Sequence, residues 1–463
     1  MWITDNTSFK GEAVQTIKNT YPKLLNKLSN NTLENLAQSS NLLLFPNDIS
    51  ESGDLDKDAM IVKTYNGTIQ FQNVIGFIGY GQERLNIHSR FSTEGMGDNF
   101  LHYMLKRVLN INVTNLETDT SNKLELYDLL RYIFPSYLNA ALKKGVLRQY
   151  QRFEYNDANI KGTIDIARHI KQNTPFTGKV AYSTREYTGD NNVMELIRHT
   201  IEYIQSSSRN GNQILNSSDE VRHNVAAVIR STPSYSIGKR QKVIIKNQLT
   251  PVRHAFYTEY RDLQRLCLMI LRHQKNNLGD GDDQTIHGII FDVAWLWEEY
   301  LNTLMKDKGI QHPHNRADNR TELDKKNPFY IFKSDTESSK GRRLVYPDFF
   351  STEGKFVLDG KYKKGLDNDG DNKDSKGGLQ RNDLNQMITY MYIQKYRSAS
   401  VIYPATTKGQ GETLIGVLNG YGAKIFKYGL MIPQNIADFA SFESAMKKSE
   451  AAFGNYINKR YND

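Results

Sequence analysis

The sequence predicts a multidomain chain of the mixed α+β and α/β class, because its residue pattern changes along its length. Residues 1–115 alternate apolar and polar residues, which is typical of strands, and residues 116–280 carry apolar residues mainly at helical spacing. Residues 281–463 combine both patterns, which predicts a mixed sheet flanked by helices. At about 150 residues per domain, a chain of 463 residues accommodates three domains, and we place them over these three ranges.

The composition limits the classes of protein to which the chain can belong. Hydrophobic residues make up 38% of the sequence, and there is no uncharged apolar run of about 18 residues, so we expect no membrane span. With no secretory signal and one cysteine, Cys267, we expect a cytoplasmic protein without disulfides or cysteine zinc clusters. The 60 Lys and Arg residues outnumber the 51 Asp and Glu residues, and this surplus favours a polyanionic partner.

The first two parts of the chain are predicted as follows. Alternating runs separated by glycines over residues 59–91 predict a small β-meander or barrel, which a helix beginning at residue 99 follows. In the middle part, apolar residues at i, i+3 and i+4 predict helices over 126–145, 192–206 and 255–273.

A basic stretch in the middle part lacks acidic residues. From Arg222 to His254 there are seven Lys and Arg residues and no Asp or Glu. Such a stretch is either a solvated basic face or a contact with phosphate or a partner, and the sequence leaves both interpretations open.

The last part is predicted to alternate helices and strands. We expect an amphipathic, aromatic helix over 286–308, a second helix over 380–397 and a helical tail over 433–463. Strands are expected over 329–333, 343–351, 355–363, 399–403 and 413–417.

Three charged residues on two of these strands form the candidate site. Asp359 and Lys361 are two residues apart in an extended segment, so their side chains point to one face, and a hairpin brings Asp348 near Asp359. Two close carboxylates repel, and a divalent cation relieves the repulsion; oxygen ligands in an incomplete cage suit Mg²⁺. We therefore predict Asp348 and Asp359 as metal ligands and Lys361 as the group that holds the attacking water in metal-assisted phosphodiester hydrolysis.

Residues on two predicted helices add to this site. Gln386 and Tyr390 are four residues apart and share one face of the second helix, and Glu298 lies on the preceding helix after Leu296-Trp297. The alternative is a surface hairpin with a salt bridge between Asp359 and Lys361, because a bare Asp-x-Lys triplet is common. The additional residues, on elements of the right type, favour the catalytic interpretation.

This set of residues resembles the PD-(D/E)xK nuclease superfamily, including the Gln-x-x-x-Tyr helix of its RecB-like branch. Within this superfamily the chain resembles the McrC family in particular, and this resemblance covers about residues 150–405. The segments that carry it are Gly162–Ile170, Asn173, Arg185–Asn192 and Leu196–Ile201 in the middle part, then Leu296–Glu298, Tyr346–Asp348, Leu358–Lys361 and Asp383–Tyr390.

The resemblance implies the endonuclease subunit of a McrBC-type, modification-dependent restriction system, which acts on DNA containing 5-methylcytosine in antiviral defence. It implies that Asp348 and Asp359 bind Mg²⁺, that Lys361 is the catalytic lysine, and that Glu298 and Gln386 support the active site. It further implies a hetero-oligomer with a McrB-like AAA+ GTPase ring and modified double-stranded DNA as the substrate.

The absence of a nucleotide motif agrees with this expectation. No Gly-x-x-x-x-Gly-Lys-Ser/Thr segment occurs, so we expect the chain itself to bind no nucleotide, and any GTP dependence to come from a partner. Two alternatives stay open: a stand-alone RecB-like repair nuclease, and a non-catalytic scaffold that activates the GTPase.

Overall fold

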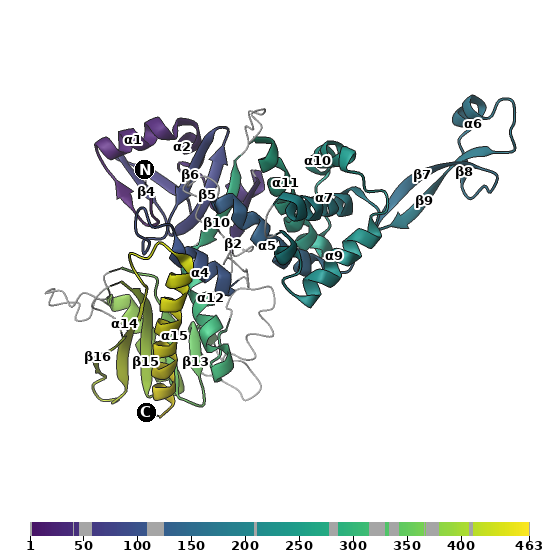
Figure 1. Ribbon diagram of the computed structural model, residues 1–463. Coiled ribbons are helices and arrows are strands. Elements are labelled where there is room, and N and C mark those ends of the chain that lie inside the picture. The colour runs from purple at the N-terminus through teal and green to yellow at the C-terminus, as the bar shows by residue number, and fades with distance from the viewer. Residues whose placement is uncertain are drawn as a thin grey trace. The chain divides into compact units, whose positions relative to one another are not determined.

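The computed structural model describes most of the chain as a mixture of helices and several β-sheets (Figure 1). The described residues are 2–39, 41–45, 58–108, 125–207, 211–276, 286–313, 329–332, 342–364, 366, 379–406 and 411–462. The chain separates into two compact units, the first made of Met1–Lys123 and Asp282–Asp463, the second of Leu124–Gly281. The expected ranges 1–115 and 281–463 thus share one unit, and the division into three domains stays a prediction.

The N-terminal part of the first unit contains two sheets. The predicted strands between residues 59 and 91 are confirmed, whereas residues 12–39 form helices that the strand-like pattern did not predict. The first sheet has the order β1-β4-β3 and the second β2-β10-β5-β6. Their bounds are Ser8–Phe9 (β1), Asn41–Phe45 (β2), Val62–Tyr65 (β3), Thr68–Phe71 (β4), Val74–Tyr80 (β5), Glu83–Ile87 (β6) and His287–Asp292 (β10), with helices Glu12–Thr20 (α1), Pro22–Leu28 (α2) and Leu33–Ser39 (α3).

The prediction of one helix over 286–308 is wrong in its first part. Residues His287–Asp292 form β10, which pairs with β2 in parallel and with β5 in antiparallel orientation. All six residues are buried, and a strand buried on both faces has an apolar run instead of alternation, which periodicity does not separate from a helix. The Asp292 side chain accepts a hydrogen bond from the Ala294 N–H at 2.9 Å, which caps helix α12 (Val293–Met305).

A five-stranded sheet forms the core of the C-terminal part. Its order is β13-β14-β15-β17-β16; the three inner strands are parallel, and the two edge strands are antiparallel to their neighbours. Helix α14 covers one face, and α12 and α15 pack on the other (Figure 1). The bounds are Phe349–Ser351 (β13), Phe356–Gly360 (β14), Ser398–Ala405 (β15), Gly411–Val417 (β16), Lys424–Met431 (β17), Arg381–Gln394 (α14) and Phe439–Asn462 (α15).

Three differences from the expected elements concern this part. The strand expected over 343–351 is divided into β12 (Arg342–Leu344) and β13, because Pro347 between them cannot donate a ladder hydrogen bond. β12 instead pairs with β11 (Tyr330–Phe332) in a two-stranded sheet. β17 was not predicted.

The predicted helix that begins at residue 99 is confirmed as α4 (Asn99–Val108), which packs on α12.

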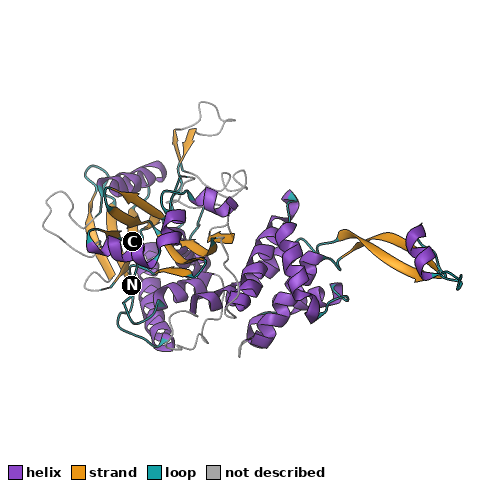
Figure 2. Ribbon diagram, turned by 90° about the horizontal axis from the view of Figure 1, so that it is seen from above, coloured by secondary structure: helices purple, strands orange, loops and turns teal. Residues whose placement is uncertain are grey.

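The second unit is a helical bundle that carries a slender arm (Figure 2). The three predicted helices are confirmed as α5, α7 and α11, and α11 packs on both others. The helices are Glu125–Leu142 (α5), Asn192–Ser207 (α7), Gly211–Leu215 (α8), Asp219–Ser231 (α9), Arg240–Leu249 (α10) and Thr258–Asn276 (α11). No helix of the described residues is long and apolar enough to cross a membrane.

The arm is a hairpin whose two long strands we did not predict. It consists of β7 (Gln149–Asp157) and β9 (Val180–Thr188), with the short β8 (Thr163–Ile164) and helix α6 (Ile166–Gln172) at its far end. Over Arg152–Asn156 of β7, polar residues alternate with the aromatic residues Phe153 and Tyr155, and the burial of the strand alternates with the same period of two. This alternation is the signal from which the strand could have been predicted.

Two glycines set the close approach of β5 and β10. At Gly288 the backbone φ is +153°, and a Cβ would lie 2.1 Å from the Phe77 carbonyl oxygen; Gly76, on β5, faces β10 in the same way. We predict that Gly288→Ala lowers the free energy of unfolding by about 2 kcal/mol or more, because the added methyl group forces the strands apart. Urea denaturation measures this loss.

The matched control is Gly67→Ala, where φ is also positive but no atom lies within 4 Å of the added Cβ. Backbone strain alone predicts a loss of about 1 kcal/mol at Gly67. Equal losses for the two variants would show that close strand packing is not what requires glycine at position 288.

Candidate active site

The two predicted acidic residues meet where β13 and β14 pair. The register joins Phe349 to Leu358, and one step further along it places Asp348, just before β13, opposite Asp359 in β14. The Gly360 N–H donates a hydrogen bond of 2.7 Å to Asp348 Oδ2. The Asp359 side chain is fully buried, so the surface hairpin considered as an alternative is not what forms here.

Lys361 lies directly after β14 and forms an ion pair with Asp359. Its Nζ is 2.8 Å from Asp359 Oδ2, and its backbone N–H donates to the Ile402 carbonyl at 2.9 Å, which fixes the strand end against β15. Burial by itself lowers the pKa of Lys361, but the carboxylates of Asp359 and Asp348 outweigh burial and raise this pKa above its usual range. The ammonium therefore stays charged at neutral pH.

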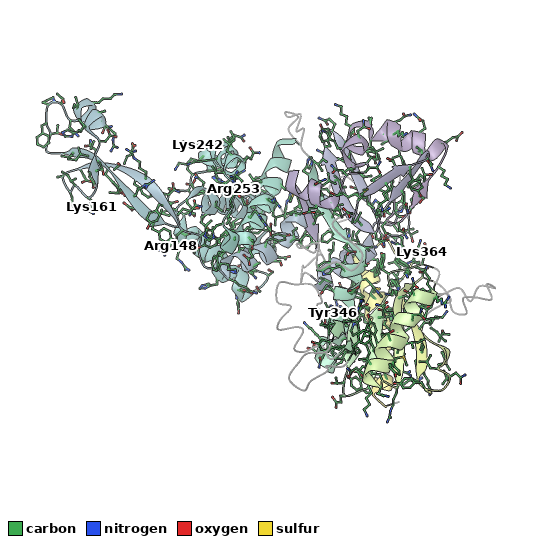
Figure 3. The ribbon with its side chains drawn as sticks, turned by 180° about the vertical axis from the view of Figure 1, so that it is seen from behind. Arg148, Lys161, Lys242, Arg253, Tyr346 and Lys364 are labelled. Atoms are coloured by element: carbon green, nitrogen blue, oxygen red, sulfur yellow. The ribbon has the colours of Figure 1, made fainter. Side chains whose placement is uncertain are left out.

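Helix α14 reaches the site through a chain of hydrogen bonds. Gln386 Nε2 donates to the Tyr390 hydroxyl at 2.8 Å, and that hydroxyl donates to the Tyr346 carbonyl at 2.8 Å. Figure 3 labels Tyr346, two residues before Asp348. Burial and the nearby Asp348 carboxylate raise the pKa of Tyr390, so its hydroxyl stays protonated and keeps donating. Gln386 thus acts on the backbone that carries Asp348.

Glu298 approaches β14 from the other side of the sheet. A Cβ on Gly360 would meet Glu298 Cγ at 3.5 Å and Leu301 Cδ1 at 3.2 Å, so helix α12 packs closely on this glycine. Glu298 therefore lies beside the residue that separates Asp359 from Lys361. The structure brings all five predicted site residues to the end of β14, from three elements and the segment before β13.

Sequence reasoning missed His312, which lies next to Asp348. His312 Nδ1 is 2.5 Å from the Asp348 carbonyl oxygen, Nε2 is 3.5 Å from Glu299 Oε1, and the ring stacks on Phe349 at 4.5 Å. A single histidine 36 residues before its partner has no motif spacing, so no sequence signal could have identified it.

The donor set fits a divalent cation held partly by water. Apart from the Lys361 ammonium beside Oδ2, no donor among the described residues reaches the buried Asp359 carboxylate, and a metal ion satisfies such an oxygen as its Oδ1. Within the described ranges, no group of three or more His, Cys, Asp or Glu is arranged to hold a metal. Two carboxylates suit Mg²⁺, which keeps several waters, better than a structural zinc ion, which takes four protein ligands.

A family described as "McrBC 5-methylcytosine restriction system component" matches residues 69–404, well over half of the sequence. No curated protein matches. Among solved structures, a refined half-complex from a tetradecameric assembly of Thermococcus gammatolerans McrB AAA+ hexamers with bound McrC is 14% identical, with 99% of each chain covered and a TM-score of 0.47. The cryo-EM structure of the Thermococcus gammatolerans McrBC complex is 13% identical over 66% of this chain and 87% of that one, with a TM-score of 0.32.

The Asp359–Lys361 pair yields a stability prediction. We expect Lys361→Met to lower the free energy of unfolding by about 3 kcal/mol or more, because it leaves a buried carboxylate without its counter-charge. A raised lysine pKa contributes fully below the ordinary value of about 10.4, so the loss should be constant from about pH 6 to 9. Urea denaturation across this range measures it.

The control is Lys363→Met, which breaks the 3.0 Å pair of Lys363 with Asp383. That lysine side chain is 39% exposed, so we expect a loss below about 1 kcal/mol. A Lys361→Met protein as stable as the control would contradict the buried-pair interpretation.

Proposed function

The chain belongs to the family of McrBC 5-methylcytosine restriction system components, and from this premise we propose that it is the endonuclease subunit. In this proposal it cleaves phosphodiester bonds of modified double-stranded DNA with Mg²⁺ and works with an AAA+ GTPase partner. The observation that carries the proposal is the pairing of Asp348 with Asp359, with the Lys361 ammonium 2.8 Å from the buried carboxylate.

The surrounding elements support a PD-(D/E)xK nuclease core. Asp348 precedes an edge strand, Asp359 lies on the next strand and Lys361 directly follows it. Gln386 lies on the helix that covers the same face, where Val357 and Tyr390 share one apolar cluster. Charged residues are seldom buried on a hydrophobic strand unless they are paired or functional, and two acids and a lysine at one strand end fit metal-assisted hydrolysis.

Each side chain has a distinct part in the proposed reaction. Asp348 and Asp359 hold Mg²⁺, which, when bound, polarises a phosphoryl oxygen and activates water. Lys361 is protonated, so it donates hydrogen bonds to the attacking water or a phosphate oxygen and offsets the charge that develops there. The Gln386–Tyr390 chain holds the backbone before Asp348 in place. Glu298 packs beside Gly360 and supports the strand end from behind.

The arm is our candidate for the contact with the partner. Its far end exposes five apolar side chains, and α6 has no buried residue. Large apolar side chains gathered on a surface mark interaction sites, and a component of a system requires another component to bind. The five residues, between 46% and 69% exposed, are Ile160, Ile164, Ile166, Ile170 and Phe176.

The basic stretch 222–254 stays a second candidate contact. Lys242 and Arg253 are exposed (Figure 3), whereas the Arg240 guanidinium lies 5.9 Å from the centre of the Tyr203 ring and so takes part in packing within the unit. Lys242 and Arg253 are therefore better placed than Arg240 to contact a partner.

We predict that Asp348→Ala, Asp359→Ala and Lys361→Ala each reduce DNA cleavage about 10³-fold or more, because each removes a group acting on the transition state. Glu298→Ala and Gln386→Ala should reduce it about 10–100-fold, because these residues act through others. The measurement is Mg²⁺-dependent cleavage of methylated plasmid with the partner and GTP. The control is Asp307→Ala, an exposed acid outside the site. Near wild-type cleavage by any of the first three variants would refute the site assignment.

We predict that Ile166→Asp with Phe176→Asp weakens binding to the GTPase partner about 10-fold or more and removes stimulation of its GTP hydrolysis, because both changes put charge into an apolar contact. Steady-state GTP hydrolysis with purified proteins measures this effect. Val417→Asp is the control, since Val417 is 56% exposed and lies on β16, outside both the arm and the basic stretch.

Asp359→Ala should stimulate hydrolysis normally while cutting no DNA, because the arm and the site lie on separate elements. Cleavage by the isolated chain without nucleotide, together with no effect on the partner's hydrolysis, would instead favour a stand-alone nuclease.

A further inference from the structure

Tyr362 follows Lys361 directly and points to the opposite face of the sheet. It is buried, and its ring contacts Phe91 edge-on at 4.8 Å and Trp297 at 6.4 Å. Its hydroxyl forms a 2.6 Å hydrogen bond with Ser89 Oγ. Residues of the N-terminal part, 273 positions away in sequence at Ser89, therefore enclose the side chain next to the proposed catalytic lysine.

The Arg90 side chain also contacts Tyr362, at the backbone carbonyl and at the ring. Its Nη1 donates to the Tyr362 carbonyl at 3.4 Å, and its guanidinium lies 5.2 Å from the centre of the Tyr362 ring. Arg90 is itself fixed by Asp5: the backbone N–H and Nε donate to the Asp5 carboxylate at 2.7 Å each, and Nη2 also bonds to it. Nη2 further donates to Asn73 Oδ1 at 2.6 Å, so each nitrogen of the Arg90 guanidinium has a partner.

Ser89 is held in turn by Asp98. The Ser89 N–H donates to Asp98 Oδ2 at 2.8 Å, and the Ser92 hydroxyl donates to the other oxygen of that carboxylate. Asp5, Ser89, Arg90 and Asp98 are all buried, and we name this set, with Tyr362, the tyrosine clamp. Buried ion pairs such as Arg90–Asp5 give little net stability compared with apolar packing, but they fix one arrangement of the groups around them.

The backbone at Lys361 is thus held from several directions. Its N–H donates to Ile402, Lys363 pairs with Asp383 on the α14 side, and Tyr362 is held on the other side. Releasing Tyr362 would let the backbone shift and carry the Lys361 ammonium away from its position beside Asp359. Misplacement of a catalytic group by about 1 Å can cost up to about 10²-fold in rate.

We propose that the tyrosine clamp positions Lys361, so that Tyr362, Ser89 and Arg90 of this chain are positioning residues for the nuclease reaction. The inference rests on the proposed function and extends it: the N-terminal part completes the active site. A nuclease portion without residues 1–98 would lack every N-terminal contact of Tyr362 described above.

Tyr362→Phe tests this proposal, because it keeps the ring and removes only the hydrogen bond to Ser89. We expect the kcat for Mg²⁺-dependent cleavage by the assembled complex to fall about 10-fold, with the KM for DNA unchanged within about two-fold. Ser89→Ala should lose at least as much, because it also removes the hydrogen bond that the Phe91 N–H donates to Ser89 Oγ at 3.1 Å. The double variant should be no worse than Ser89→Ala alone, since the Tyr362–Ser89 bond is already absent there.

Tyr300→Phe is the matched control. Tyr300 is fully buried in the same unit, and its hydroxyl donates a 2.8 Å hydrogen bond to Glu450, away from the strand end. Its thermal unfolding midpoint should fall about as much as that of Tyr362→Phe, with kcat unchanged. Arg90→Lys keeps the charge beside Asp5 but loses the guanidinium group and its several hydrogen bonds. It should lower kcat as well and provides a second probe.

The outcomes distinguish a failure of the positioning role from a failure of the proposed nuclease function. Wild-type kcat in Tyr362→Phe and Ser89→Ala overturns the positioning role and leaves the proposed nuclease intact. Equal losses of kcat in Tyr362→Phe and Tyr300→Phe overturn it too, because they reduce the effect to general stability. A wild-type complex that does not cleave DNA with Mg²⁺ and GTP overturns the proposed function and this inference with it.

Discussion

The buried carboxylate of Asp359 is the group on which the arrangement of the C-terminal part depends. A carboxylate without water is costly unless a counter-charge or a cation compensates it, and here the Lys361 ammonium lies 2.8 Å away. No further donor among the described residues reaches this carboxylate, and Asp348, which accepts a hydrogen bond from the Gly360 N–H, adds a second acid at the same strand end. The strand end is thus electrostatically incomplete in a way that a divalent cation would complete.

Maintaining this state requires support from both faces of the sheet. On one face, α14 holds the backbone before Asp348 through Gln386 and Tyr390. On the other, the tyrosine clamp encloses the residue after Lys361. The two networks hold the segments on either side of the paired acids, before β13 and after β14. The tyrosine clamp and the pairing of β10 with β2 and β5 join the N-terminal and C-terminal parts within one compact unit.

The elements that sequence patterns did not identify share a physical cause. β10 is buried on both faces by strands from the N-terminal part, so its apolar run lacks the alternation that distinguishes a strand. The β7–β9 arm alternates, but it lies between strongly helical segments that dominate the pattern. His312 contacts the Asp348 carbonyl oxygen although the two residues are 36 positions apart in the sequence. For β10 and His312 the deciding partner lies outside the local window, whereas the arm has a local signal.

The sequence by itself determined which residues form the candidate site: the spacing of Asp359 and Lys361 on one face, the acid before the neighbouring strand, and the Gln386–Tyr390 helix are all local features with a fixed period. It also determined the three long helices α5, α7 and α11 of the middle part. Only the tertiary structure decided that Asp359 is fully buried, that Tyr346 receives the α14 hydrogen bond, and that Arg90 and Ser89 reach Tyr362. Burial and long-range hydrogen bonds depend on which segments pack together, and no local periodicity specifies that choice.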